Sequence, residues 1–145
     1  MPSIYIIIQA RMGSTRLPGK VLRELDGLLL IDRVVKQLSE IKYDTRICVA
    51  MTTKPEATIL YNHCQYSLNV LVYRGESANV LKRYWDCYSE IKLDGCDSDI
   101  IIRVTADDPF KCPELIHDCV DVMLENDSFD YVSNITTNGY PEGLD

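Results

Sequence analysis

The sequence predicts an α/β domain with a mostly parallel sheet, and two observations support that fold class. Short apolar runs typical of buried strands alternate along the chain with segments whose apolar residues recur at helical spacing. The first run, residues 4–9, is apolar almost throughout, as expected for a strand that helices cover on both faces. Strand–helix–strand units joined by right-handed crossovers then produce a sheet whose strands run parallel.

The first half of the chain contains a loop, a helix, a strand and the start of a second helix. Residues 10–20 are rich in glycine, serine, threonine and proline, which is typical of a loop. Apolar residues at helical spacing predict a helix over residues 29–41, and an apolar run predicts a strand at 46–51. Residues 53–56 have the pattern of a capping box, which predicts a helix that continues to about Gln65.

The second half continues the alternation. Strands are expected at residues 69–73, 99–105 and 130–133, and the three isoleucines that follow Asp99 are expected to be buried. Helices are expected at 77–92 and 113–125, the latter opening with a proline that the first helical turn tolerates. The apolar stripe of the helix at 77–92 is expected in the core: Val80, Leu81, Tyr84, Trp85, Tyr88 and Ile91.

Composition indicates one globular domain over residues 1–145. Hydrophobic residues make up 46% and charged residues 26% of the chain, which is enough apolar material for one core. The longest uninterrupted apolar runs, such as Ile4 to Ile8, are too short to span a membrane, and the N-terminus has no secretory signal, so we expect a cytoplasmic protein. A net charge of −7 argues against nucleic-acid partners.

The expected ligand edge of the sheet carries a cationic loop. Ligands of parallel sheets bind at the carboxyl ends of the strands, which here means residues 10–20, Arg74–Gly75 and Asp107–Asp108. Residues 1–23 contain four basic residues and no acidic one, although acids outnumber bases in the whole chain. A small anionic ligand therefore fits this segment better than a polyanion does.

The loop at residues 10–20 has the groups that a phosphate chain needs. Gly13 permits a positive φ and a close approach of the backbone to a ligand, and hydroxyl and cationic side chains surround it. The spacing matches neither a Walker A motif nor Gly-x-Gly-x-x-Gly, and a merely solvated basic loop is the alternative. The candidate polar groups are Arg11, Ser14, Thr15, Arg16 and Lys20.

A second candidate follows the strand at residues 99–105. Asp107 and Asp108 come just before Pro109, at the edge where ligands bind. Carboxylates together with phosphate oxygens are the usual ligands of Mg²⁺. A simple turn that begins with aspartate is the alternative interpretation, and the cationic loop on the same edge favours the metal site.

These segments resemble the cytidylyltransferases that activate acidic sugars. The long motif from Ile8 to Leu22 carries most of the resemblance, and weaker motifs follow it in the expected order along the whole chain. Within the family, the chain is most similar to the branch of the spore coat polysaccharide biosynthesis proteins. The weaker motifs lie at residues 73–75, 80–84, 103–109, 130–134 and 140–145.

The resemblance implies a three-layer, Rossmann-like nucleotidyltransferase domain related to GT-A glycosyltransferases. It also implies CTP and a sugar as substrates, Mg²⁺ as cofactor, and a homodimer. Arg11 and Lys20 would hold the triphosphate with help from Arg16, and Asp107 would bind Mg²⁺ with Asp145 as a second ligand; Arg11, Lys20 and Asp107 would be catalytic. The implied nucleotide-binding residues are Ala10, Arg11, Gly13, Ser14, Arg16, Lys20, Arg74 and Thr105.

The chain departs from the family pattern at three places. Asn79 stands where the branch usually has aspartate, and Asp108 stands where cysteine is common. Family members continue well beyond the position of Asp145, so the resemblance implies a domain that is incomplete at its C-terminal side.

The expected activity is transfer of CMP from CTP to a sugar, with release of pyrophosphate, in surface polysaccharide biosynthesis. Positioning and electrostatic stabilisation of the phosphates would supply most of the catalysis. Two alternatives stay open: a GT-A-like glycosyltransferase that uses a nucleotide-sugar, and a nucleotide-binding fragment without catalysis. The sequence does not identify the sugar, and cytosine as the base rests on the resemblance alone.

Overall fold

The computed structural model describes residues 2–93 and 98–134, and a parallel sheet forms its centre. Four strands pair in the order β5–β4–β1–β6, and every neighbouring pair is parallel. The predicted parallel sheet is therefore confirmed. The strands are β1 (Ile4–Gln9), β4 (Thr45–Thr52), β5 (Leu71–Gly75) and β6 (Ile100–Thr105).

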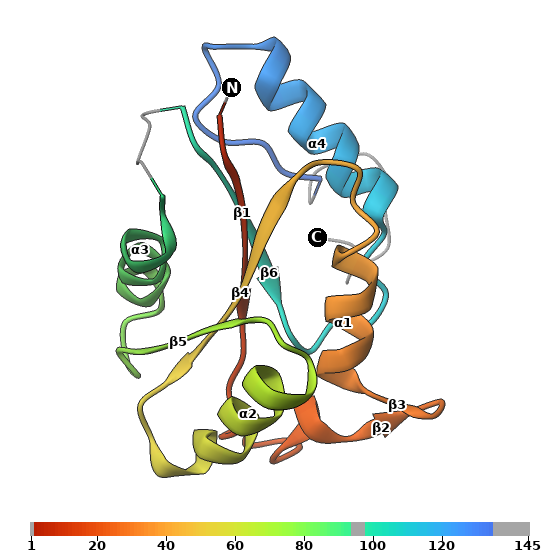
Figure 1. Ribbon diagram of the computed structural model, residues 1–145, viewed down its shortest axis with the longest axis vertical. Coiled ribbons are helices and arrows are strands. Elements are labelled where there is room, and N and C mark those ends of the chain that lie inside the picture. The colour runs from red at the N-terminus through yellow and green to blue at the C-terminus, as the bar shows by residue number, and fades with distance from the viewer. Residues whose placement is uncertain (1, 94–97, 135–145) are drawn as a thin grey trace.

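Helices cover both faces of this sheet, as Figure 1 shows. Helix α3 (Val80–Ile91) packs on one face, and α1 (Leu30–Leu38), α2 (Thr58–Asn62) and α4 (Pro113–Glu125) contribute to the cores on the other. The predicted three layers are therefore present. Shorter elements complete the described chain: β2 (Glu24–Leu25), β3 (Leu28–Leu29) and helical turns at Lys20–Leu22, Pro55–Ala57 and His63–Ser67.

The apolar run of β1 explains why the sheet has two cores. Ile6 and Ile8 join the large cluster under α1 and α2, whereas Tyr5 and Ile7 join a separate cluster under α3. Successive residues of a strand point to opposite faces of the sheet, and helices cover both faces, so all four side chains are fully buried. A strand in this position can hold few polar side chains, which is why the run is apolar almost throughout.

The start of α3 shows what Asn79 does. Asn79 is the N-cap residue, and its side-chain oxygen accepts a hydrogen bond of 2.9 Å from the Lys82 backbone N–H. Asparagine and aspartate serve about equally well in this position. The substitution of asparagine for the aspartate of the branch thus preserves the helix cap.

The prediction of a capping box at residues 53–56 is wrong. Strand β5 lies two residues later than predicted. The Thr53 N–H donates to the Gly75 carbonyl at 3.2 Å, so Thr53 continues the β4–β5 pairing and does not cap a helix. Asn69 has a φ of 53°, a left-handed conformation that a strand does not accommodate, and the strand begins only at Leu71.

Two side chains of the predicted core stripe on α3 point to solvent. Tyr84 and Tyr88 are buried, but Leu81 and Trp85 are 79% and 64% exposed. A helix that packs on a sheet buries only one stripe, and these two residues lie beside it. Ile101 is exposed as well, because β6 is the outer strand of the described sheet and α3 packs mainly over β1, β4 and β5.

The strand predicted at residues 130–133 is wrong: this segment is irregular, and Tyr131 is largely exposed. Aromatic and β-branched residues favour strands only where a neighbouring strand supplies a ladder. The remaining predicted elements agree with the structure to within a few residues, and the helix at 113–125 agrees at both ends.

Leu38 and Leu81 form a matched pair for testing the core. Leu38→Ala should lower the free energy of unfolding by about 2–5 kcal/mol, because it opens a cavity under α1. Leu81→Ala deletes the same atoms at a solvent-exposed position and should change the free energy of unfolding by less than about 0.5 kcal/mol. Urea unfolding monitored by circular dichroism measures both, and equal losses would contradict this arrangement of α1 and α3.

Candidate active site

The candidate site lies where β1 and β6 end side by side. In the parallel register Gln9 is opposite Thr105, so the two strands reach the edge of the sheet at the same level. The Ala106 N–H donates to the Gln9 carbonyl at 2.9 Å, and the Ala10 N–H donates to the Ala50 carbonyl at 3.0 Å. The loop after β1 and the turn after β6 therefore leave the sheet as neighbours.

Lys20 and Asp107 meet across this edge. The Lys20 ammonium donates a hydrogen bond to Asp107 Oδ2 and forms an ion pair with it, although 87 residues separate them in sequence. The Asp107 side chain is 42% exposed and that of Lys20 is less exposed. The sequence placed a cationic loop and a pair of acids on one edge, and the structure brings one residue of each into contact.

The charge of Asp107 is stabilised by this contact. Partial burial alone would raise the pKa of Asp107, but the hydrogen bond and the charge of Lys20 outweigh it and lower the pKa below the usual value. The Thr105 side chain also donates a hydrogen bond that lowers this pKa. Asp107 is consequently an anion at neutral pH, ready for a cation.

The loop holds its shape through bonds within itself. The Met12 carbonyl accepts from the N–H groups of both Ser14 and Gly19, at 3.0 and 2.9 Å. The Ser14 hydroxyl accepts from the Leu17 N–H at 3.3 Å, so Ser14 helps to fix the loop. The positive φ expected at Gly13 occurs instead at Gly19, with a φ of 66°.

Gly13 has a different use in the structure. A Cβ atom at this position would lie 3.2 Å from the Glu56 carboxylate, so a larger residue would crowd the segment that follows β4. Ala10 is buried in the large core cluster under α1 and α2. Both small residues therefore permit close packing at the edge of the sheet.

Arg11 and Arg16 supply positive charge that is not neutralised. Both side chains are exposed, and neither forms an ion pair with any residue in the described part of the chain. Together with Lys20, which contacts Asp107, they give the loop three cations. This arrangement attracts an anion that carries several charges.

Asp108 is less exposed than Asp107 and has a different lysine as its partner. Its carboxylate forms an ion pair of 2.8 Å with the Lys111 ammonium, and its other oxygen accepts from the Phe110 N–H at 3.3 Å. Sequence reasoning missed Lys111, which is buried. The only signal was the spacing of three residues between an acid and a base, which surface pairs share.

The Arg74 side chain is hydrogen-bonded to backbone carbonyls of the segment that follows β4. Its guanidinium donates to the carbonyls of Thr53 and Lys54 at 3.1 and 3.0 Å. It lies at the end of β5, two strand positions from β1 and on the far side from Asp107. The structure thus does not bring Arg74 together with Lys20, whereas Thr105 contacts Asp107 directly. Asp145 lies outside the described residues.

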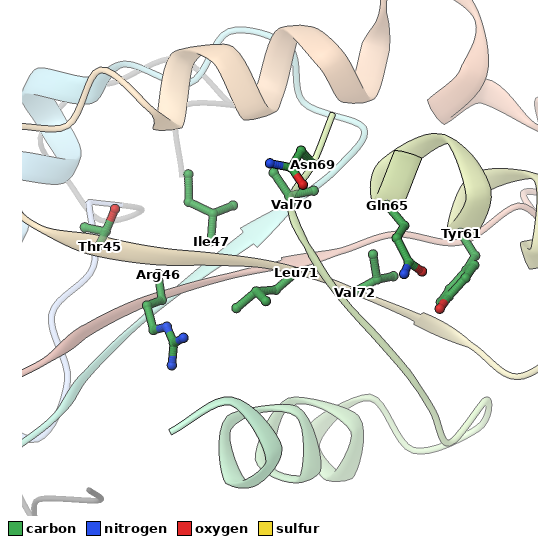
Figure 2. Close-up of a pocket in the computed structure, with 9 residues that line it drawn as sticks. All are labelled: Thr45, Arg46, Ile47, Tyr61, Gln65, Asn69, Val70, Leu71 and Val72. Carbon is green, nitrogen blue, oxygen red and sulfur yellow. The ribbon is translucent and has the colours of Figure 1, made fainter. Parts of the chain in front are cut away.

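A hollow in the described surface lies away from this edge. Its volume is about 650 Å³, and it opens at the amino ends of β4 and β5, opposite to the edge that carries Lys20 and Asp107. Figure 2 shows the Arg46 side chain pointing towards α3 and the Tyr61 side chain extending from α2. Since ligands of parallel sheets bind at carboxyl ends, this hollow is not the candidate site.

A hard cation fits Asp107 only with additional oxygen ligands. Within residues 2–93 and 98–134, no three histidine, cysteine or acidic side chains gather closely enough to hold a metal. A partly exposed carboxylate in contact with the cationic loop suits a metal that arrives with phosphate oxygens. Over the same residues, no helix is both long and apolar enough to cross a bilayer.

Known proteins are similar to this chain both in sequence and in fold. A family profile described as cytidylyltransferase matches residues 5–140. Spore coat polysaccharide biosynthesis protein SpsF of Bacillus subtilis is 38% identical over 140 residues, which cover 94% of this chain and 54% of SpsF. A 3-deoxy-manno-octulosonate cytidylyltransferase of Francisella philomiragia is 29% identical over 86% of this chain and 48% of its own length.

A solved structure agrees with this result. A cytidylyltransferase from Leptospira borgpetersenii superposes with a TM-score of 0.78 and 28% identity, over 88% of this chain and 51% of that one. The sheet and its flanking helices therefore have the Rossmann-like nucleotidyltransferase fold. The chain spans about half the length of the curated relatives it matches.

The contact between Lys20 and Asp107 predicts a measurable change in acidity. In Lys20→Met the pKa of Asp107 should rise, because the largest group that lowers it is removed while burial remains. A carboxylate with a lowered pKa stabilises the fold at pH values above its pKa in the unfolded chain, and this contribution disappears on acidification. The free energy of unfolding of the variant should therefore fall less than that of the wild type between about pH 5 and 2.

Carbon NMR titration of the Asp107 carboxyl group measures this pKa. Lys82→Met removes a lysine from an exposed pair with Asp86 and serves as the control. An unchanged Asp107 titration in Lys20→Met would show that the two side chains do not meet in solution.

Proposed function

The chain belongs to the cytidylyltransferase family, and from that premise we propose that it transfers CMP from CTP to a sugar and releases pyrophosphate. One observation carries the proposal: Lys20 of the cationic loop and Asp107 of the β6 turn meet at the ligand edge of the sheet. We propose further that it acts in surface polysaccharide biosynthesis, in the cytoplasm and as a homodimer, with Mg²⁺ as cofactor.

The charges of the site suit a nucleoside triphosphate. A triphosphate carries several negative charges, and Arg11, Arg16 and Lys20 provide three cations on one loop. The backbone of Ala10, Gly13 and Ser14 borders the same loop and offers the close approach that phosphates need. A polyanion such as nucleic acid fits less well, because the chain as a whole is acidic.

Asp107 would hold the metal, together with phosphate oxygens. When bound, Mg²⁺ would neutralise charge on the phosphates, and Asp107 is a partly exposed acid at this edge that could face it. Lys20 neutralises Asp107 when no ligand is present, so the ammonium would have to turn from the carboxylate towards the phosphates. Lys20 would then be paired with Asp107 in the ligand-free protein and with phosphate in the complex, where Mg²⁺ would neutralise Asp107.

The reaction itself asks the protein mainly for position and charge. A sugar hydroxyl attacks the α-phosphorus of CTP, and the bond to the pyrophosphate oxygen breaks. Negative charge accumulates on the leaving pyrophosphate, where Arg11, Arg16 and Lys20 would stabilise it. Thr105 would orient Asp107 through its hydrogen bond, and Arg74 would act by holding the segment at Thr53 and Lys54.

Ligand selectivity tests the proposal before any turnover is measured. With Mg²⁺ present, CTP should raise the melting temperature of the chain more than ATP, GTP or UTP at the same concentration, because a ligand stabilises the state that binds it. Release of pyrophosphate from CTP and an acceptor sugar would then separate the proposed reaction from a GT-A-like glycosyltransferase, which releases none. Stabilisation by CTP without turnover would indicate a nucleotide-binding module.

Variants of the cationic loop test the residue roles. Lys20→Ala and Arg11→Ala should each reduce the rate of CMP transfer at least about tenfold, equivalent to about 1.4 kcal/mol, since each removes a charge from the leaving group. Lys82→Ala, on α3, should leave the rate unchanged. Wild-type turnover in both loop variants would overturn the assignment of phosphate binding to this loop.

A further inference from the structure

An unpaired carboxylate lies against the cationic loop. Glu56 belongs to the helical turn Pro55–Ala57, which follows β4, and its side chain is exposed. A Cβ atom placed on Gly13 would be 3.2 Å from Glu56 Oε1, so this carboxylate borders the backbone of the loop that follows β1. Within residues 2–93 and 98–134, no ion pair or side-chain hydrogen bond joins Glu56 to another residue. A negative group beside a loop that would bind phosphates requires an explanation.

The segment that carries Glu56 is fixed at both ends. At its start, the Thr53 N–H donates to the Gly75 carbonyl at 3.2 Å, and the Arg74 guanidinium donates to the Thr53 carbonyl at 3.1 Å. At its end, Ala57 is fully buried in the core cluster under α1 and α2. The backbone at Glu56 therefore has little freedom to move away from the loop.

The strand order places an acid on each side of the end of β1. Strands β4 and β6 flank β1, Glu56 follows β4, and Asp107 follows β6. A nucleotide bound at the end of β1 would thus lie between two carboxylates. Asp107 has Lys20 as a partner and would have the metal in the complex, but Glu56 has no such cation among the described residues. An unneutralised carboxylate suits only a part of the nucleotide that carries no negative charge.

We infer that Glu56 accepts hydrogen bonds from the ribose hydroxyls of the nucleotide and thereby makes the site selective for a ribonucleotide. The inference rests on the proposed function and deepens it. The third, second, first and fourth parallel strands of the chain lie side by side in that order, as in Rossmann folds. In those folds the loop after the first strand binds the phosphates, and an acid after the second hydrogen-bonds the ribose. Glu56 follows the second parallel strand, β4, and a hydroxyl donates strongly to a carboxylate.

Other roles of Glu56 predict different behaviour. If the side chain only supported the shape of the loop, its removal would affect all nucleotides alike. If it faced the phosphates, its removal would tighten the binding of every triphosphate, because a repulsion would be lost. A hydrogen bond to the ribose instead couples the carboxylate to a hydroxyl group, so that once one of them is removed, removing the other has little further effect.

The experiment measures the affinities for CTP, 2′-deoxy-CTP and 3′-deoxy-CTP by titration calorimetry with Mg²⁺. The wild type should bind CTP at least about tenfold more tightly than one of the deoxynucleotides, which lacks a donor to a charged acceptor. Glu56→Ala should weaken CTP binding by about the same factor and leave that deoxynucleotide within about threefold of its wild-type affinity. Glu90→Ala, which removes an exposed glutamate from α3, is the matched control and should keep the wild-type preference for CTP.

A second variant, Glu56→Gln, separates the charge from the shape of the side chain. Glutamine keeps an oxygen acceptor but loses the negative charge, so the preference for CTP should shrink without vanishing. Both variants should fold with nearly the wild-type melting temperature, because Glu56 is exposed and unpaired. The inference is overturned if Glu56→Ala keeps the preference, weakens CTP and both deoxynucleotides equally, or binds all of them more tightly than the wild type does.

Failure of the proposed function would look different. If another ribonucleoside triphosphate binds and CTP does not, the assignment of CTP is wrong, and the same comparison with that nucleotide and its deoxy forms tests Glu56. If no nucleoside triphosphate binds to the folded wild-type chain, the proposed function and the inference both fail. Equal wild-type affinities for CTP and both deoxynucleotides would overturn the inference alone.

Discussion

The parallel register between β1 and β6 is the constraint on which the candidate site depends. Because Gln9 lies opposite Thr105, two segments far apart in sequence leave the sheet next to each other. Their backbones are joined by the bond from Ala106 to Gln9, and their side chains by the pair of Lys20 and Asp107. The buried apolar run of β1 secures this register, since a slip by one residue would exchange the faces that its side chains occupy.

The sequence predicted the layers well because burial on two faces leaves a strong pattern. Residues 4–9 had to be apolar to lie between α3 and the helices of the opposite face, and they were recognised as a strand for that reason. The predictions failed where pairing between segments far apart in the sequence decides the secondary structure. Thr53 joins β5, and residues 130–133 form no strand, although local propensity favoured a cap and a strand. Ile101 is exposed because of its place in the sheet, which no local pattern reveals.

The site was predictable in outline because ligands of parallel sheets bind at one edge. That rule selected both Lys20 and Asp107 before their contact was known. It could not show that Arg74 donates to backbone carbonyls, or that Asp108 pairs with a buried lysine, Lys111. Those facts depend on which side chains the fold brings together. The resulting site has a partly exposed acid in contact with a lysine of the cationic loop, an arrangement suited to a metal carried by an anionic ligand.

The central claim is that Asp107 and the cationic loop share one metal-bound nucleotide, and calorimetric titration of CTP into Asp107→Asn tests it most directly. In the wild type, Mg²⁺ should strengthen CTP binding markedly. In Asp107→Asn, CTP should still bind without metal through the loop, but Mg²⁺ should no longer strengthen the binding. An equal effect of Mg²⁺ on the variant and on the wild type would contradict the account, because it would place the metal away from β6.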